Sequence, residues 1–160
     1  MSGNDLQALP AWVASNTGIG GVRVARELGG GNANTTLLLD SDDGRLVLRS
    51  PAANAVSATA HRGIERESRV LRALAGRAAV PDFIAWCEDA SVIGSPFLVA
   101  RYVDGVAITD ALPESYPDSV ESVNRLGEDL VIQLAGVHRL PWQEIGLADF
   151  GRPEGFLQRQ

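Results

Sequence analysis

Arg49 and Glu67 are two charged residues whose positions in the sequence suggest a shared role. Period-2 alternation in the predicted strand over residues 45–49 places Arg49 on the same face as Val47. In the predicted helix over residues 64–74, Glu67 falls on the apolar stripe at helical spacing. A carboxylate on an apolar face needs a cationic partner, so we predict that these two side chains form an ion pair. From these residues alone, a solvated arginine at a strand end and an ordinary helix carboxylate remain the alternative.

A glycine-rich stretch at residues 29–34 is the second feature that could bind a ligand. It contains Gly30, Gly31, Asn32 and Asn34. Glycine tolerates positive φ angles and leaves room for a ligand, so the backbone N–H groups of such a loop can approach a polyphosphate. A glycine-rich turn without a ligand is commoner, and the sequence holds neither a GxxxxGK[ST] motif nor a complete GxGxxG motif. The stretch alone leaves both uses open.

The elements that must position these residues follow from periodicity and turn signals. We expect helices over residues 5–15, 64–74 and 120–140, and strands over residues 22–28, 35–40, 45–49, 83–87 and 96–103. The predicted fold class is α+β, with a five-stranded antiparallel sheet and one inserted helix. The expected domains are an N-terminal lobe at residues 1–103, a hinge and linker at 104–119, and the start of a helical lobe at 120–160.

Composition and charge narrow the class of protein. The chain has 160 residues, of which 45% are hydrophobic and 21% charged, as is usual for a folded globular protein. A formal net charge of -6 argues against nucleic acid as a partner. No apolar stretch approaches the roughly 18 residues of a membrane span, and the N-terminus lacks the features of a signal peptide. Cys87 is the single cysteine and lies in an apolar run, so we expect a buried thiol and a cytoplasmic protein with no membrane partner.

Several short stretches together carry a resemblance to a known family. In chain order they are Leu28-Gly-Gly-Gly-Asn-Ala-Asn-Thr-Thr36, Leu46-Val-Leu-Arg49, Glu67-Ser-Arg-Val-Leu71, Gly94-Ser-Pro-Phe-Leu-Val99, Tyr102-Val-Asp-Gly105, Leu134-Ala-Gly-Val-His138 and Gly151-Arg-Pro-Glu-Gly-Phe-Leu157. From about Arg26 to Gln160, their order and spacing resemble the N-terminal part of the aminoglycoside phosphotransferase family and its choline-kinase-like relatives. The last stretch is similar to the branch that includes kinase-like domains attached to some acyl-CoA dehydrogenases.

The resemblance implies an ATP-dependent small-molecule phosphotransferase with a protein-kinase-like N-lobe, which transfers the γ-phosphoryl group to an acceptor hydroxyl. It implies that residues 29–34 cover the phosphates of ATP, and that Arg49 stands where many kinases use a lysine. It also implies a hinge at residues 101–103 that pairs through its backbone with adenine. The expected nucleotide-binding residues are Gly30, Gly31, Asn32, Asn34, Val47, Arg49, Glu67, Ala100, Arg101 and Val103. The expected cofactors are ATP and Mg2+, and the expected partners are ATP and an unidentified small-molecule acceptor.

A second kinase-like pattern lacks the residues that its chemistry would need. His138-Arg-Leu140 followed by Asp149-Phe-Gly151 resembles the signatures of protein kinases, but that chemistry requires an aspartate where Leu140 stands. We therefore dismiss a protein-kinase interpretation and treat His138 as a residue on a helix face near the core.

The family's catalytic aspartate and metal-binding aspartate are expected C-terminal to the matched region. We therefore expect no catalytic residue and no metal ligand in this chain, and we expect the isolated 160 residues to be a truncated and inactive part of an enzyme. Two alternatives stay open. One is a non-catalytic nucleotide-binding or regulatory module with the same lobe, and the other, ranked last, is a nicotinamide or flavin enzyme, which would require a parallel sheet.

Overall fold

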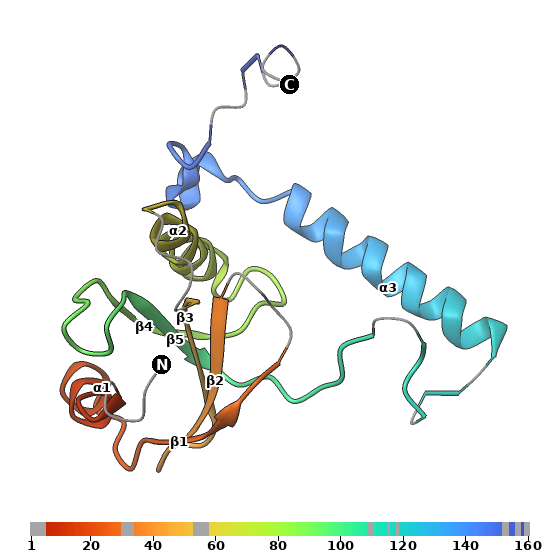
Figure 1. Cartoon of the computed structure of the whole chain (residues 1–160). Coiled ribbons are helices and arrows are strands. Elements are labelled where there is room, and N and C mark those ends of the chain that lie inside the picture. Colours follow the sequence, from red (N-terminus) through yellow and green to blue (C-terminus); the bar gives the residue numbers. More distant parts are fainter. Residues whose placement is uncertain are drawn as a thin grey trace.

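One antiparallel sheet organises the chain in the computed structural model (Figure 1), which describes residues 6–29, 34–52, 58–108, 111–114, 116–117, 119–151, 154–155 and 158. The strands are β1 (Arg23–Glu27), β2 (Asn34–Asp40), β3 (Leu46–Pro51), β4 (Phe83–Cys87) and β5 (Phe97–Arg101). Their spatial order is β1-β2-β3-β5-β4, and each neighbouring pair is antiparallel. The helices are α1 (Leu9–Thr17), α2 (Ala58–Leu74), α3 (Val120–His138) and the short segment η2 (Gln143–Leu147). The predicted α+β class, with five antiparallel strands and an inserted helix, is confirmed.

Strand β5 separates two hydrophobic clusters on opposite faces of the sheet. Its residues Phe97 and Val99 belong to the cluster covered by α1, whereas Leu98 and Ala100 belong to the cluster covered by α2. This alternation explains why the strand reads as an unbroken apolar run in the sequence. On the α1 face, Trp12 packs edge-on against Phe97 with their ring centroids 4.9 Å apart. The α2 face carries the candidate site described below.

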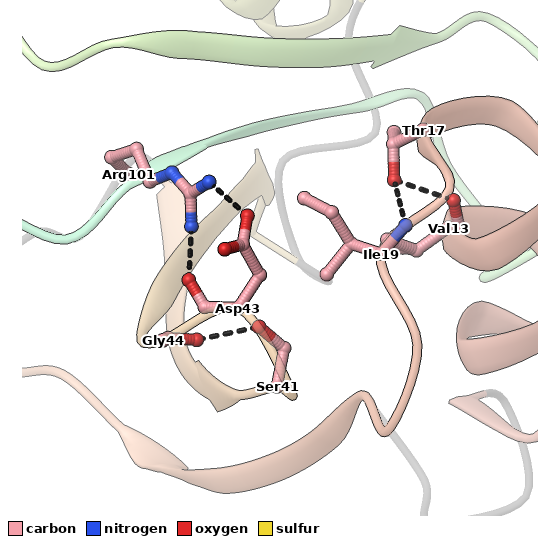
Figure 2. Close-up of polar contacts among 7 residues, drawn as sticks. All are labelled: Val13, Thr17, Ile19, Ser41, Asp43, Gly44 and Arg101. Atoms are coloured by element: carbon pink, nitrogen blue, oxygen red, sulfur yellow. Dashed lines mark hydrogen bonds and ion pairs between the residues drawn. The ribbon is translucent and has the colours of Figure 1, made fainter.

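The predicted hairpin between β2 and β3 is present and contacts the segment that precedes β1. Ser41 closes the turn by donating its hydroxyl to the carbonyl of Gly44, as Figure 2 shows. Asp42 donates its backbone N–H to the carbonyl of Gly20, and its carboxylate occupies the space that a Cβ on Gly21 would need. The glycine pair before β1 therefore serves the packing of this turn.

Two helix boundaries differ from the prediction for local reasons. α1 begins at Leu9, with Pro10 in its first turn, where the missing N–H of proline costs nothing. It ends at Gly18, which has a φ of 77° and donates its N–H to the carbonyl of Ala14. α2 begins at Ala58, six residues before the predicted start, because residues 58–63 carry no apolar periodicity to reveal the helix.

Helix α3 lies away from the sheet, and the chain returns along it to α2 (Figure 1). The prediction of a helix beginning at residue 120 is confirmed, but none of its residues is buried. Leu130 and Ile132 are 67% and 63% exposed. The expectation that His138 lies near the core is therefore wrong, because no described element covers this helix and the residue is exposed.

Cys87 ends β4 and is buried at 2% exposure, as predicted. Burial raises the pKa of its thiol, which keeps the sulfur in its unreactive protonated form. A search of the described helices found none with the length and apolarity needed to cross a bilayer.

Candidate functional site

The residues predicted to bind a ligand converge on one cleft, on the face of the sheet that α2 covers. The cleft has a volume of about 570 Å³, which falls within the usual range of small-molecule sites. Seven of the ten predicted residues line it: Asn34, Val47, Arg49, Glu67, Ala100, Arg101 and Val103. The other three, Gly30, Gly31 and Asn32, lie outside the described residues. Whether these ten residues bind a nucleotide stays a prediction.

Strand alternation accounts for the way β3 and β5 build the floor of this cleft. Val47 pairs with Ala100 across the two strands, and Arg49 pairs with Leu98. All four residues line the cleft, whereas Leu48, between Val47 and Arg49, points into the α1 cluster and is fully buried. Because side chains alternate between the two faces, the same strand supplies both core and site.

The predicted ion pair between Arg49 and Glu67 is confirmed. Nη1 of Arg49 donates to Oε1 of Glu67 at 2.7 Å, and the two side chains are 36% and 28% exposed. The alternative, two separately solvated side chains, is therefore excluded. This charge-assisted hydrogen bond holds a guanidinium at the wall of the cleft, and a guanidinium is a side-chain group that suits carboxylate and phosphate ligands.

Helix α2 supports the acidic member of the pair. Ile64 and Leu71 pack with Leu98 and Ala100 in the apolar cluster between this helix and the sheet. Glu67 lies one turn from each of these two helix residues, on the same face. Burial raises the pKa of the Glu67 carboxyl above its ordinary value of 4.5, although the neighbouring Arg49 opposes the shift.

The raised pKa of Glu67 predicts how stability depends on pH. The folded state favours the protonated carboxyl, so the contribution of Glu67 to the free energy of unfolding is fully present below pH 4.5 and is lost as the pH rises through the raised pKa. We expect the free energy of unfolding of the unmodified chain to fall, relative to that of Glu67→Gln, as the pH rises from about 4 to about 7. Chemical denaturation across this range measures the difference.

The matched control for this prediction is Glu65→Gln, which removes an exposed carboxylate from the same helix. It separates the effect of burial from that of removing one negative charge. A difference between the unmodified chain and Glu67→Gln that stays constant over this range would contradict the prediction.

The segment that leaves β5 offers backbone rather than side-chain groups to the cleft. The N–H groups of Arg101 and Tyr102 already donate within the sheet, to the carbonyls of Asp82 at 2.8 Å and Arg45 at 3.1 Å. The guanidinium of Arg101 donates to the carboxylate and backbone carbonyl of Asp43, in the turn between β2 and β3 (Figure 2). Val103 is the next residue along and is 61% exposed. Among the described residues, none accepts a hydrogen bond from its N–H.

The cleft is also lined by five residues that the sequence analysis did not predict: Leu28, Thr36, Leu71, Pro81 and Leu98. Three of them carried a usable signal. Thr36 follows Asn34 by two residues and Leu98 precedes Ala100 by two, the spacing of a shared strand face, and Leu71 follows Glu67 by one helical turn. Pro81 lies in the connection between α2 and β4, where no periodicity applies.

The lining of the cleft combines an apolar surface with a cation. Its floor is apolar where Val47, Leu98 and Ala100 meet, and a cation, Arg49, stands beside that floor. No group of three or more His, Cys, Asp or Glu side chains that could hold a metal ion occurs among the residues the structure describes.

Comparison with known proteins agrees with this arrangement. Residues 24–160 match the model of the family described as "APH: Phosphotransferase enzyme family". A crystal structure from Ralstonia eutropha JMP134, of a protein provisionally assigned as an aminoglycoside phosphotransferase, superposes with a TM-score of 0.77 at 30% identity. That match covers 96% of this chain and 44% of the other. It extends to the kinase-like N-terminal lobe, with its five antiparallel strands and inserted helix.

Curated relatives are much longer than this chain. Acyl-CoA dehydrogenase family member 10 of Mus musculus is 33% identical over 132 residues, which is 81% of this chain and 12% of that protein. Acyl-CoA dehydrogenase family member 11 of Gallus gallus is 33% identical over 143 residues, 88% of this chain and 18% of that protein. The chain thus spans less than a fifth of either relative, and their dehydrogenase names describe those whole proteins. The nicotinamide or flavin alternative loses its basis, because the sheet it required is parallel and this one is antiparallel.

Proposed function

The chain belongs to the phosphotransferase enzyme family, and from this premise we propose that its cleft binds ATP. We propose further that the protein containing it transfers the γ-phosphoryl group of ATP to a hydroxyl of a small-molecule acceptor. The observation that carries the proposal is the Arg49–Glu67 ion pair in the wall of a cleft of about 570 Å³. Phosphoryl transfer depends mainly on positioning and electrostatic stabilisation, and a fixed guanidinium supplies both.

The phosphates are proposed to lie at the Arg49 end of the cleft. Glu67 accepts a hydrogen bond from one Nη of the guanidinium, and Asn34 and Thr36 line the same cleft, with Thr36 paired to Arg49 across β2 and β3. A guanidinium binds phosphate oxygens through several N–H donors in one plane, whereas an ammonium acts as a point charge. Arginine at this position therefore fixes the orientation of the phosphate chain as well as its charge.

Adenine is proposed to lie over the apolar floor made by Val47 and Ala100. Because the N–H groups of Arg101 and Tyr102 are used within the sheet, the N–H of Val103 is the hinge donor that can reach the adenine edge. This narrows the expected hinge contact from three residues to one backbone group. Recognition through the backbone leaves the side chain of residue 103 free to vary.

Val103→Pro tests this contact because proline removes the N–H; since proline also fixes φ at residue 103 and restricts Tyr102, thermal unfolding of the variant checks that the fold is kept. We expect the affinities for ATP and for adenosine to fall together by about tenfold, the loss of one hydrogen bond in the cleft. Isothermal titration of both ligands measures the change. The matched control, Val103→Ala, keeps the N–H and should bind both ligands as the unmodified chain does. Unchanged affinity in Val103→Pro would remove the hinge assignment.

Transfer itself is tested on the gene product that contains these residues. It is incubated with ATP, Mg2+ and a panel of small-molecule alcohols, and ADP release that depends on one acceptor supports the proposal. Binding of ATP with no acceptor-dependent ADP release across that panel would favour the non-catalytic module instead.

A further inference from the structure

Asp149 and Phe150, in the triplet that resembles a protein-kinase motif, contact two arginines of helix α2. The ring of Phe150 lies 3.9 Å from the guanidinium carbon of Arg66 and 5.7 Å from that of Arg69, both on α2. Nη1 of Arg66 also donates to the carbonyl of Phe150 at 2.7 Å. Nη2 of Arg69 donates to Oδ1 of Asp149 at 2.6 Å and to the carbonyl of Gly146 at 3.3 Å. We call the set Arg66, Arg69, Asp149 and Phe150 the clasp.

The clasp holds the same helical turn that carries Glu67. Successive helix residues are rotated by about 100°, so Arg66 and Arg69 share a face that is rotated away from Glu67. One face of α2 therefore meets the sheet and the other meets a segment that lies 80 residues later in the chain. Figure 1 shows η2 beside α2, after the chain has returned along α3.

Two sets of contacts on different faces fix the rotation of a helix more closely than one set can. The apolar cluster between α2 and the sheet is small, with Ile64 and Leu71 as the buried residues from the helix. A small apolar contact has little directional preference, whereas hydrogen bonds to two arginines specify both distance and angle. A small rotation of α2 would move the Glu67 carboxylate away from Arg49, because that contact is a single hydrogen bond of 2.7 Å.

We propose that the clasp positions Glu67 against Arg49 and thereby sets the affinity of the cleft for the phosphates of ATP. The inference rests on the proposed function for its ligand. Its four residues are positioning residues, because they act through α2 and do not line the cleft. The triplet at 149–151 thus couples the segment after α3 to the nucleotide site.

The first test is Phe150→Ala in the full chain. We expect faster hydrogen exchange of the α2 amides around residues 66–70, measured without nucleotide, and a loss of ATP affinity of about three- to tenfold. Affinity for adenosine should not change, because adenosine has no phosphates. Phe150→Tyr keeps the ring face over Arg66, so its hydrogen exchange in α2 and its ATP affinity should equal those of the unmodified chain. Asp149→Asn should have a smaller effect in the same direction, and its matched control, Asp129→Asn on the exposed α3, should have none.

The second test separates positioning from a general loss of structure. In a Glu67→Ala background, Phe150→Ala should change ATP affinity by less than about twofold, because the hydrogen-bond acceptor that the clasp positions against Arg49 has been removed. Additive effects of the two substitutions would overturn the proposal, and so would unchanged exchange of α2 in Phe150→Ala. If the unmodified chain binds no ATP, the proposed function fails, but hydrogen exchange still decides whether the clasp holds α2.

Discussion

Replacing Arg49 by methionine is expected to weaken ATP binding by about 100-fold while leaving the affinity for adenosine within about twofold. Methionine keeps much of the length and apolar stem of the arginine but removes the cation. The guanidinium stands at the phosphate end of the cleft in the proposed complex, so only ligands that carry phosphates should lose affinity. Isothermal titration of ATP and of adenosine measures the two affinities.

Arg49→Lys is the informative control for this prediction. Many kinases use lysine at the corresponding position, and an ammonium retains the charge while losing the planar set of donors. We expect it to recover most of the ATP affinity that Arg49→Met loses. An equal loss of ATP and adenosine affinity in Arg49→Met would contradict the assignment, since it would indicate a general change in the cleft. Thermal unfolding of both variants shows whether Glu67, left without its partner, disturbs the fold.

The second large effect is a loss of stability, expected from Leu48, which lies on the face of β3 opposite to Arg49. Leu48→Ala should lower the free energy of unfolding by about 2–5 kcal/mol, because the side chain is fully buried and its removal leaves a cavity. Val47 is half-buried on the cleft face, so Val47→Ala should cost about 1 kcal/mol or less. Chemical denaturation of the two variants gives both values.

The affinity for ATP and adenosine should fall more in Val47→Ala than in Leu48→Ala, the reverse of their order in stability loss. Val47→Ala removes an apolar contact proposed for adenine and should weaken ATP and adenosine binding alike by a few-fold. Leu48→Ala should bind both normally at temperatures where it is folded. Comparable destabilisation by both substitutions would mean that the alternation of β3 does not divide core from site.

The parts of the site that could be predicted from the sequence are those that local periodicity determines. The sequence predicts the pairing of Arg49 and Glu67 because strand and helix spacing each assign a residue to a face, and neighbours only a few residues away set both faces. The start of α2 was missed because residues 58–63 have no apolar repeat. Pro81 was missed because it joins the cleft through a loop, which has no period at all.

Long-range contacts explain what the sequence could not predict. The pattern of α3 predicts a helix, but it cannot say whether another element covers that helix, and so His138 was placed near the core. The dismissal of Asp149-Phe-Gly151 as a catalytic motif rested on the missing aspartate at Leu140. The contact of this triplet with Arg66 and Arg69 joins residues about 80 positions apart, which no local pattern reveals.

The pairing of the Arg101 guanidinium with Asp43 has a consequence for chemical probes of this cleft. Its side chain is committed to Asp43, and the neighbouring residue offers a main-chain N–H. A purine-mimicking inhibitor anchored there would meet atoms that every amino acid except proline supplies. If Val103 is the hinge donor as proposed, point mutations there would give little resistance to such a compound, but it would also discriminate poorly between members of the family. Selectivity would have to come from groups that reach the guanidinium of Arg49, where many kinases carry lysine instead.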